Sequence, residues 1–319
     1  MPAILIVGVG SIGTRHVRNL LSLGYNNLAT CDPLKEKLEA VSRFGADRTY
    51  EDVRVALETE KPDIVFICNP THLHISTAVL ALRFGTHVFI EKPISHTLQG
   101  IDALERVAKK KKKIVMVACN FRFSKGFQKL ESVLRKQTFG TPLFVRVAVG
   151  YYLPTARKGV SYKNIYAART QGGGVVLDSG SHVVDYLTAL FGKVKASKMV
   201  KGTMQTIGIE SEETAILALK HESGVLSSVT LDYVSRKPTH TIEVVTDRGT
   251  LLLDLKEDTL TYEDARSKKV LYTGDGDVND MFCEELKHFM KCVTGGAQPR
   301  QDIGRAEEVL RTLLAIKAQ

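Results

Sequence analysis

Three side chains in this sequence could hold a reacting hydroxyl group or move its proton: Lys92, Asp178 and His182. Asp178 and His182 are four residues apart, a spacing that places two side chains on one face of a helix. Asp185 follows three residues later and could orient the imidazole, which exchanges protons near neutral pH. Such a set suits alcohol oxidation, in which a hydroxyl loses a proton while its carbon loses hydride. The alternative is structural, with Asp178 capping a helix and His182 in the core.

Lys92 belongs to the tripeptide Glu91-Lys92-Pro93, directly after the β-branched and aromatic run at 87–90. That run predicts a strand, and the ligands of open α/β sheets bind beyond the carboxyl ends of the strands. Pro93 fixes its own φ and removes a backbone donor, which stiffens the chain where the lysine emerges, and it could follow a cis peptide bond. We therefore expect Lys92 in a ligand crevice; the competing interpretation is a surface turn.

A glycine-rich turn near the N-terminus predicts the elements around this lysine. The apolar run at 3–7 is typical of a strand buried on both faces of a parallel sheet, and a helical pattern that ends near Gly24 follows the turn. The first glycine makes the tight turn, the second lets the backbone approach a pyrophosphate, and the third lets helix and strand pack closely. The residues of this turn expected to bind a dinucleotide are Gly8, Gly10, Ser11, Ile12 and Gly13.

An acidic residue stands where a dinucleotide's ribose would be bound. The run at 27–31 predicts a second strand and ends in Asp32, about 20 residues after the glycine turn. The carboxylate can bind both ribose hydroxyls and would repel a 2′-phosphate, so NAD is favoured, while Lys35 and Arg15 leave NADP open. The alternative is that Asp32 caps a helix ahead of Pro33.

Strands and helices alternate through the first part of the chain, which predicts a doubly wound parallel (Rossmann) sheet in a domain of residues 1–122. Several residues follow later strand ends and should line the cofactor crevice, although each could instead be a turn residue or a helix cap. These residues are Asn69, Pro70, Thr71, His74, Glu91, Lys92 and Asn120. Glu91 could pair with Lys92 or line the nicotinamide site.

The remaining residues, 123–319, predict an α+β domain. Short alternating runs, the first at 144–149, favour an antiparallel or mixed sheet. Helices are expected at 279–293 and 303–318. The segment 172–187 carries Asp178 and His182 on its predicted helix.

Composition narrows the class of protein. The chain has 319 residues, 44% hydrophobic and 25% charged, which is typical of a soluble protein of two domains. No apolar run reaches the roughly 18 residues that span a membrane and no basic leader precedes the first strand, so we expect a cytoplasmic protein. The five cysteines form no C-x-x-C pair and no metal-ligand spacing is present, so neither a disulfide framework nor a metal site is expected.

The net charge of +9 owes much to the five lysines at 109–113, which are expected at the end of a helix in solvent. No motif for reading nucleic acid accompanies them, so no nucleic-acid partner is expected. A basic balance also suits anionic ligands such as a dinucleotide or a phosphorylated sugar.

Over essentially its whole length the chain resembles the glucose-fructose oxidoreductase and inositol dehydrogenase family, called Gfo/Idh/MocA. The resemblance rests on the turn at 8–13, Glu91-Lys92-Pro93, the run at 120–123 and the pattern from Asp178 to Asp185. It implies a Rossmann domain followed by a domain with a large open, mostly antiparallel sheet that often forms a homodimer or homotetramer. It also implies that Lys92, Asp178 and His182 are catalytic, that NAD or NADP exchanges hydride with a sugar or polyol, and that loops of the second domain select the substrate.

The segment 151–169 resembles that of members acting on amino sugars or nucleotide sugars, but it lacks their tryptophan and second proline after Leu153-Pro154. Its aromatic and basic side chains could stack on a sugar and bind an anionic group; the alternative is an interface arm. The residues expected to bind substrate are Arg122, Tyr152, Arg157, Tyr166 and Arg169. Two other functions are known among relatives: a glycoside hydrolase that oxidises its sugar transiently with NAD, and a cofactor-binding regulator without turnover.

Overall fold

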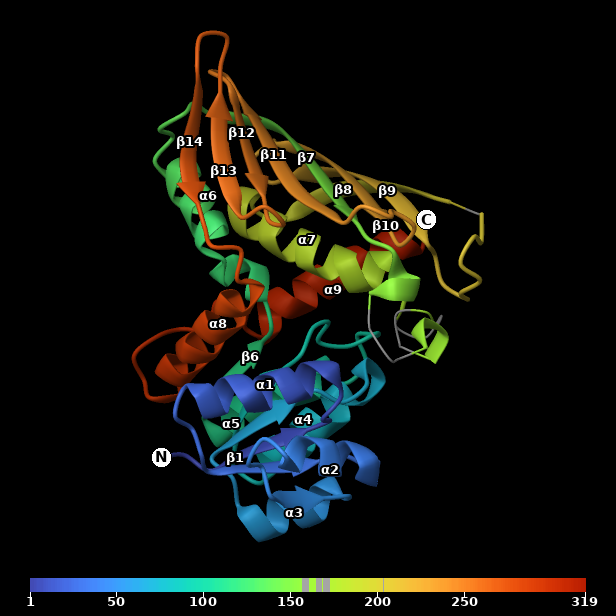
Figure 1. Cartoon of the computed structure of the whole chain (residues 1–319), viewed down its shortest axis with the longest axis vertical. Coiled ribbons are helices and arrows are strands. Elements are labelled where there is room, and N and C mark those ends of the chain that lie inside the picture. The colour runs from blue at the N-terminus through green and yellow to red at the C-terminus, as the bar shows by residue number, and fades with distance from the viewer. Residues whose placement is uncertain (157–160, 165–167, 169–172, 203) are drawn as a thin grey trace. The chain divides into compact units, whose positions relative to one another are not determined.

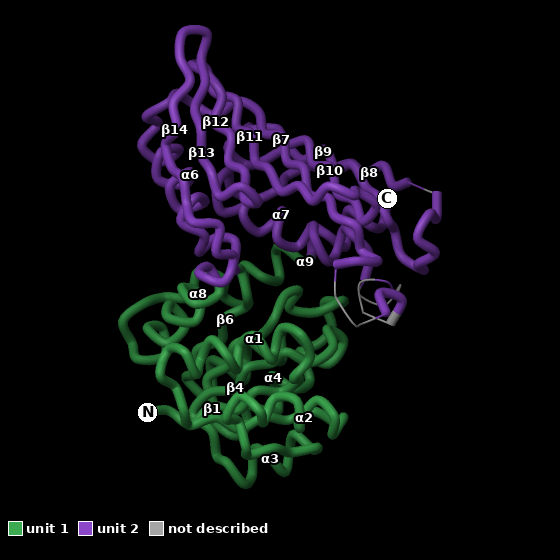
Figure 2. The backbone as a smooth tube through the Cα atoms, in the orientation of Figure 1, with its two compact units in different colours: residues 1–119, 282–310 green, residues 120–281, 311–319 purple. Residues whose placement is uncertain are grey.

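The computed structural model describes residues 1–156, 161–164, 168, 173–202 and 204–319. The chain forms two compact units, coloured separately in Figure 2: unit 1 contains residues 1–119 and 282–310, and unit 2 contains residues 120–281 and 311–319. This division differs from the predicted domains 1–122 and 123–319, because a late segment returns to unit 1. Arg157, Tyr166 and Arg169, predicted to bind substrate, lie outside the described residues.

Unit 1 is built on a six-stranded parallel sheet with the strand order β3-β2-β1-β4-β5-β6. The four central strands are almost fully buried, as expected for apolar runs covered on both faces. The strands are β1 (Ile4–Val7), β2 (Leu28–Cys31), β3 (Arg48–Tyr50), β4 (Ile64–Ile67), β5 (His87–Ile90) and β6 (Val115–Val117). The predicted Rossmann sheet is confirmed.

Helices connect these strands (Figure 1). They are α1 (Ser11–Ser22), α2 (Lys35–Ser42), α3 (Val53–Glu60), the short η1 (Thr71–Leu73), α4 (His74–Arg83) and α5 (Ile101–Lys111). In the strand order, the connection from β1 to β2 runs toward the β3 edge of the sheet, and the connection from β4 to β5 runs toward the β6 edge. Right-handed crossovers therefore place α1 and α4 on opposite faces.

The late segment joins unit 1 through aromatic packing and backbone pairing. Helix α8 (Val278–Val293) carries Phe289, whose ring lies 5.6 Å from that of Phe66 on β4 and 5.4 Å from that of Phe89 on β5. Val117 donates a backbone hydrogen bond to Gln301 at 2.9 Å. Sequence periodicity predicts α8 and α9 (Ile303–Lys317), but it does not reveal which sheet they cover.

Unit 2 contains an eight-stranded sheet with the order β14-β13-β12-β11-β7-β10-β9-β8. Only the β7 and β10 pair is parallel among these strands, so the predicted mostly antiparallel sheet is confirmed. The strands are β7 (Pro142–Gly150), β8 (Val194–Lys201), β9 (Thr214–His221), β10 (Leu226–Asp232), β11 (Thr239–Thr246), β12 (Thr250–Asp254), β13 (Thr259–Glu263) and β14 (Lys268–Thr273).

Residues alternate between buried and accessible along β9, β10 and β11, so one face of the sheet is covered and the other is open. Helix α7 (Val175–Phe191) packs on β9 and β10, and α6 (Lys125–Arg135) packs on β12 to β14 (Figure 1). Short 3-10 turns complete the unit: η2 (Asn120–Phe123), η3 (Leu153–Thr155) and η4 (Tyr162–Asn164). None of the helices in the described ranges combines the length and apolar character that crossing a membrane requires.

Candidate functional site

The glycine turn between β1 and α1 has the shape that a dinucleotide needs. A Cβ on Gly8 would lie 2.5 Å from the backbone nitrogen of Asn69, and a Cβ on Gly13 would overlap the carbonyl oxygen of Gly8. Gly10 differs, because a Cβ there would meet no described atom within 4 Å. Two glycines thus allow close packing of the turn, while the third leaves open space beside the backbone for a pyrophosphate.

The N-terminus of α1 adds electrostatic attraction for phosphate. Within the described chain, no side chain caps this helix end at Gly10 and its first turn carries no acidic residue. The free amides and the positive end of the helix dipole can therefore face an anion. Ser11 and Ile12 occupy the first positions of the helix.

Asp32 follows β2 and is 3% exposed. Its two oxygens accept backbone hydrogen bonds from Val9 at 3.0 Å and Leu34 at 3.1 Å, which tie the acid to the glycine turn. Lys37 lies 3.6 Å from the carboxylate, and it is a cation that the sequence did not single out. A carboxylate oxygen can accept more than one hydrogen bond, so Asp32 can still bind ribose hydroxyls.

Arg15 and Lys35, the cations that could accept the 2′-phosphate of NADP, contact other side chains of the protein. The Arg15 guanidinium lies 4.5 Å from the centre of the Phe282 ring, and Lys35 lies 3.4 Å from Glu51.

The loop after β4 contributes a buried acceptor. The side-chain nitrogen of Asn69 donates to Thr77 at 2.9 Å, while its Oδ1 is buried without a hydrogen-bond partner among the described residues. Thr71 is buried in η1, and Pro70 is exposed. A buried acceptor without a partner is rare in proteins, so Asn69 suits a ligand that donates a hydrogen bond.

The tripeptide at 91–93 follows β5 as predicted, and the peptide bond between Lys92 and Pro93 is cis. Lys92 is half-buried. The Glu91 side chain is buried, and each of its oxygens has a different partner. Oε1 lies 2.7 Å from Nε2 of the fully buried His16, and Oε2 accepts a hydrogen bond from the Lys92 amide at 3.2 Å. Burial acts to raise the pKa of Glu91, but the hydrogen bond and charge of His16, with the charge of Lys92, outweigh it and lower that pKa.

His74, predicted to bind the cofactor, is buried and spans two backbone segments. Its Nδ1 lies 2.9 Å from the carbonyl oxygen of Pro93, and its Nε2 lies 2.9 Å from that of Asn69. Burial lowers the pKa of this imidazole although both carbonyls oppose the shift. The side chain therefore links the loops that follow β4 and β5.

In unit 2, the N-terminus of α7 is anchored by an ion pair. Glu212 lies 3.0 Å from Lys317, and its carboxylate accepts from the Val176 amide at 3.3 Å. Gly174, with φ of 91°, passes directly over Glu212, where a Cβ would clash with the carboxylate. This anchoring sets the position of the first helical turn, which carries Asp178.

Asp178 and His182 lie on α7, which confirms the predicted helix. The Oδ2 atom of Asp178 accepts from the phenols of Tyr151 at 3.1 Å and Tyr233 at 3.0 Å. The imidazole of His182 packs edge-on against Phe121, with ring centres 4.8 Å apart. The acid is held by neutral donors and the histidine by an aromatic ring, an arrangement suited to a fixed proton acceptor.

A second histidine lies beneath Phe121. His240 is buried, its ring centre is 4.5 Å from that of Phe121, and its Nε2 is 3.3 Å from the Tyr186 hydroxyl. Burial and, to a smaller extent, the charge of Lys256 lower the pKa of His240 to about 3. His240 is therefore neutral at physiological pH.

Other predicted residues of unit 2 have protein partners. Arg122 is buried and lies 3.3 Å from Asp185, the acid expected to orient His182. The side chain of Asn120, predicted to bind cofactor, is buried and lies 3.5 Å from the sulfur of Met281. Tyr152 is half-buried, and the exposed Arg236 stacks 3.4 Å above its ring.

Sequence reasoning missed His16, Tyr233 and Arg236. His16 left a signal, since it is four residues from both Ile12 and Leu20 and so falls on the apolar face of its helix. A polar residue on such a face needs a buried partner. Tyr233 and Arg236 follow a strand. The alternation of apolar and polar residues there predicts which side chains are buried, but it does not predict which residues they contact.

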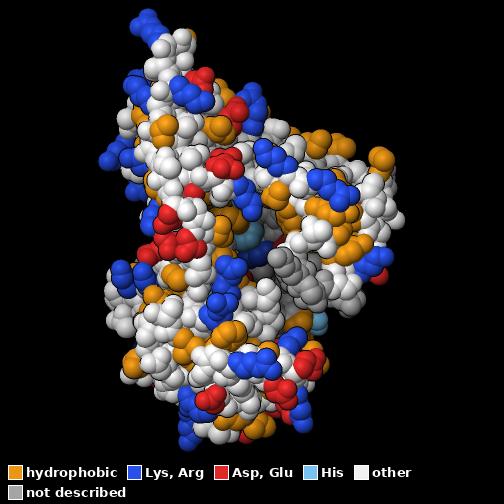
Figure 3. All heavy atoms as spheres, in the orientation of Figure 1, with side chains coloured by type: hydrophobic (Ala, Val, Ile, Leu, Met, Phe, Trp, Pro, Cys, Tyr) orange, Lys and Arg blue, Asp and Glu red, His pale blue; other side chains and the backbone are white. Residues whose placement is uncertain are grey.

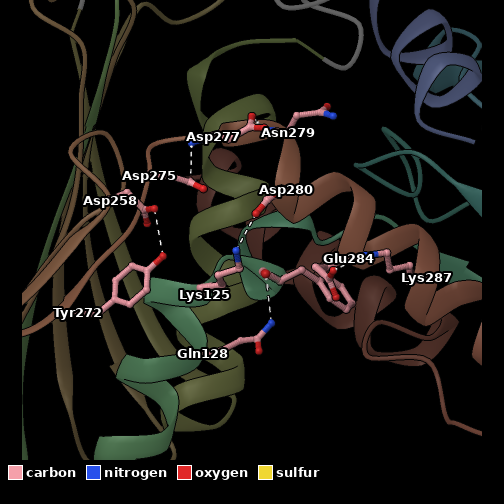
Figure 4. Close-up of polar contacts among 11 residues, drawn as sticks. Lys125, Gln128, Asp258, Tyr272, Asp275, Asp277, Asn279, Asp280, Glu284 and Lys287 are labelled. Carbon is pink, nitrogen blue, oxygen red and sulfur yellow. Dashed lines mark hydrogen bonds and ion pairs between the residues drawn. The ribbon is translucent and has the colours of Figure 1, made fainter. Parts of the chain in front are cut away.

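Acidic side chains gather around the segment that leads into α8 (Figure 4). Tyr272 donates to Asp258 at 3.1 Å, Lys125 donates to Asp280 at 2.8 Å, and the Asp277 amide donates to Asp275 at 3.1 Å. In the part of the chain that the structure describes, no three His, Cys, Asp or Glu side chains are grouped to hold a metal ion.

Basic and acidic side chains are interspersed on the face shown in Figure 3. Lys109, Lys110 and Lys111 form the last turn of α5, as expected of cations at a helix C-terminus.

Comparisons with known proteins agree with this geometry. The family described as "Oxidoreductase family, NAD-binding Rossmann fold" matches residues 3–119, and "GFO/IDH/MocA C-terminal domain" matches residues 127–252. Myo-inositol 2-dehydrogenase of Thermotoga maritima is 28% identical over 308 residues, which cover 92% of this chain and 89% of that protein. D-apiose dehydrogenase of Paraburkholderia graminis is 30% identical over 255 residues, covering 78% and 66% of the two chains.

Among solved structures, WlbA dehydrogenase from Bordetella pertussis, in complex with NADH and UDP-GlcNAcA, has a TM-score of 0.82. It is 20% identical and covers 99% of this chain and 95% of that one, so the whole fold is shared. The chain belongs to the Gfo/Idh/MocA family of oxidoreductases and carries that family's NAD-binding Rossmann domain.

Proposed function

We propose that this protein is an NAD-dependent dehydrogenase that oxidises a hydroxyl-bearing carbon of a sugar or polyol. The observation that carries the proposal is the position of Lys92 at the carboxyl end of β5. In a parallel sheet this is also the edge at which the glycine turn follows β1 and Asp32 follows β2. A half-buried lysine at this edge supports a role in chemistry over a role in a surface turn.

The proposed roles follow from the chemistry of each side chain. The Lys92 ammonium contacts the reacting hydroxyl, His182 receives its proton, and Asp178, held by two phenols, supports that transfer. The glycine turn, Asp32 and Asn69 would hold NAD, which would supply the hydride acceptor for the same carbon.

An anionic sugar, such as an amino-sugar acid or a nucleotide sugar, is the substrate class that we favour. Arg236 stacks on Tyr152, and both Arg236 and Lys237 are exposed. An aromatic ring beside a guanidinium can contact a sugar face and an acidic group together. The nucleotide sugar bound by the Bordetella relative belongs to this class.

We propose that the enzyme is a cytoplasmic homodimer or homotetramer. None of the five cysteines, all of which the structure describes, is in a disulfide, as is usual in a reducing compartment. The open face of the unit 2 sheet exposes apolar side chains, including Val200, Ile216 and Leu252. Val200 and Ile216 are direct cross-strand neighbours, so their exposed surfaces are continuous.

The test is a turnover screen with NAD and with NADP. Inositols, aldoses, glucosides, sugar phosphates and nucleotide sugars would each be supplied to the purified protein while nicotinamide absorbance is recorded. We expect NADH formation with at least one substrate, and its loss in Lys92→Ala but not in Lys109→Ala, which removes an exposed lysine of the same unit. Reduction of neither cofactor, or full activity of Lys92→Ala, would overturn the proposal. Cleavage of aryl glycosides without net NADH would instead favour a hydrolase.

A further inference from the structure

Two buried histidines hold the backbone on either side of Lys92. His16 comes from α1 and His74 from α4, helices that lie on opposite faces of the parallel sheet. His16 reaches the tripeptide through Glu91, and His74 reaches it through the Pro93 carbonyl.

Strand geometry explains why Glu91 points to α1. Side chains alternate along β5, so Glu91 lies on the same face as Phe89, two residues earlier. The His16 ring lies 5.5 Å from that of Phe89 and 5.7 Å from that of Phe66, both on this face. Glu91 therefore enters an aromatic compartment in which His16 is its hydrogen-bond partner.

Each carboxylate oxygen of Glu91 has a different hydrogen-bond donor. Oε1 accepts a hydrogen bond from Nε2 of His16 at 2.7 Å, and Oε2 accepts one from the amide of Lys92 at 3.2 Å. Nδ1 of His16 has no hydrogen-bond partner among the described residues, so within them the imidazole makes one polar contact, with Glu91. The chain of contacts runs from the phosphate-binding helix to the peptide that carries Lys92.

We propose that His16 and Glu91 are positioning residues, which fix the Lys92 peptide relative to α1 so that the ammonium is aligned when the dinucleotide is bound. The inference rests on the proposed function of Lys92. It assigns no contact with cofactor or substrate to His16, and it accounts for Glu91 without placing its carboxylate on the nicotinamide. His74 fixes the far side of the tripeptide by linking Pro93 to Asn69.

The test compares three variants with a matched control. His16→Leu removes the donor, His16→Gln retains a donor near the position of Nε2, and Glu91→Gln leaves one oxygen to serve two donors. His87→Gln is the control, because His87 is at the opposite end of the same strand and accepts from the Ile114 amide. Kinetics on a substrate from the screen, NADH affinity by fluorescence, and trinitrobenzenesulfonate labelling of Lys92 by peptide mass spectrometry are measured for each.

For His16→Leu and Glu91→Gln we expect kcat to fall about tenfold or more, since small misplacements of a reacting group are costly. NADH affinity and KM should change much less than kcat. The labelling rate of Lys92 should change in both variants, His16→Gln should restore most of kcat, and His87→Gln should match the wild type throughout. A merely structural role would lower the melting temperature without this split between kcat and KM and without altering Lys92 labelling.

The outcomes separate this inference from the proposed function. If Lys92→Ala abolishes turnover while His16→Leu and Glu91→Gln keep wild-type kcat and Lys92 labelling, the positioning role is overturned and the dehydrogenase assignment stands. Full activity of Lys92→Ala overturns the proposed function, whereas unchanged labelling overturns the inference whatever the substrate. If His16→Leu fails to fold, the double variant His16→Leu/Glu91→Leu is measured in its place. The double variant removes the buried carboxylate that His16→Leu would leave unpaired.

Discussion

At the residue scale, the positions of the proposed catalytic residues could be predicted from the sequence, but the contacts around them could not. Lys92 was predictable because it ends a strand, and Asp178 with His182 because of their helical spacing. The partners of these residues come from distant segments: Tyr151 and Tyr233 for Asp178, and Phe121 for His182. Such pairings depend on tertiary packing, which local periodicity does not encode.

The two phenols on Asp178 should matter for turnover. Tyr151→Phe and Tyr233→Phe each remove one hydrogen bond, worth about 1 kcal/mol, which corresponds to about a fivefold fall in kcat/KM. The double variant should fall further. Tyr272→Phe is the matched control, since it removes a phenol-to-aspartate bond of 3.1 Å from Tyr272 on β14 to Asp258 (Figure 4). Equal effects from all three single variants would refute a special role for the Asp178 phenols.

His240 should make the fold sensitive to acid. Its pKa of about 3 in the fold lies below the ordinary value of 6.5, so the unfolded chain binds the proton more readily. The stability that neutral His240 contributes is complete above pH 6.5 and is lost as pH falls toward 3, at about 1.4 kcal/mol per pH unit. His240→Gln should flatten the decline in urea-unfolding free energy between pH 7 and pH 5. An unchanged slope in that variant would show that His240 is not the group responsible.

At the element scale, strands with a strong apolar pattern were predictable and strands with a weaker pattern were not. Strands β9, β10 and β11 alternate cleanly between buried and accessible residues, and the sequence shows that pattern. Strands β3, β8 and β14 lie at sheet edges, where neither face imposes strict alternation, and β13 is a short strand beside β14; these four strands were not predicted. The return of α8 to unit 1 was also missed, because its partners Phe66 and Phe89 are distant in sequence.

The glycine turn supports a prediction that separates folding from cofactor binding. Gly10→Ala places a methyl group in space that no described atom occupies within 4 Å, and its φ of −67° suits any residue. The melting temperature should therefore be nearly unchanged, while NADH affinity falls about tenfold or more because the methyl group blocks the pyrophosphate. Gly13→Ala should instead destabilise the protein, since its Cβ overlaps the Gly8 carbonyl. Fluorescence titration with NADH and thermal unfolding distinguish the two; unchanged NADH affinity in Gly10→Ala would contradict the assigned pyrophosphate site.

At the scale of the whole molecule, the residues to which we assign roles are divided between the two units. Unit 1 carries the glycine turn, Asp32 and Lys92, and unit 2 carries Asp178 and His182. The composition predicted two domains, but the exchange of segments at 282–310 and 311–319 required the structure.

The open sheet face should carry the assembly contact. Ile216→Lys places a charge among apolar neighbours on this face, where Ile216 is 55% exposed, and should shift the protein toward monomer. Val55→Lys is the matched control, because Val55 is 51% exposed on α3 of unit 1. Sedimentation velocity would check both; a monomeric wild type, or equal dissociation in both variants, would contradict the proposed interface.

The most direct test of the dehydrogenase assignment is isotope transfer. Substrates from the turnover screen, deuterated at their hydroxyl-bearing carbons, would be incubated with the protein and NAD, and the cofactor analysed by mass spectrometry. Direct hydride transfer predicts that deuterium from the substrate carbon appears in the reduced nicotinamide, and that Lys92→Ala abolishes this transfer. Reduced cofactor without deuterium, or product formation with no label passing to NAD, would contradict it.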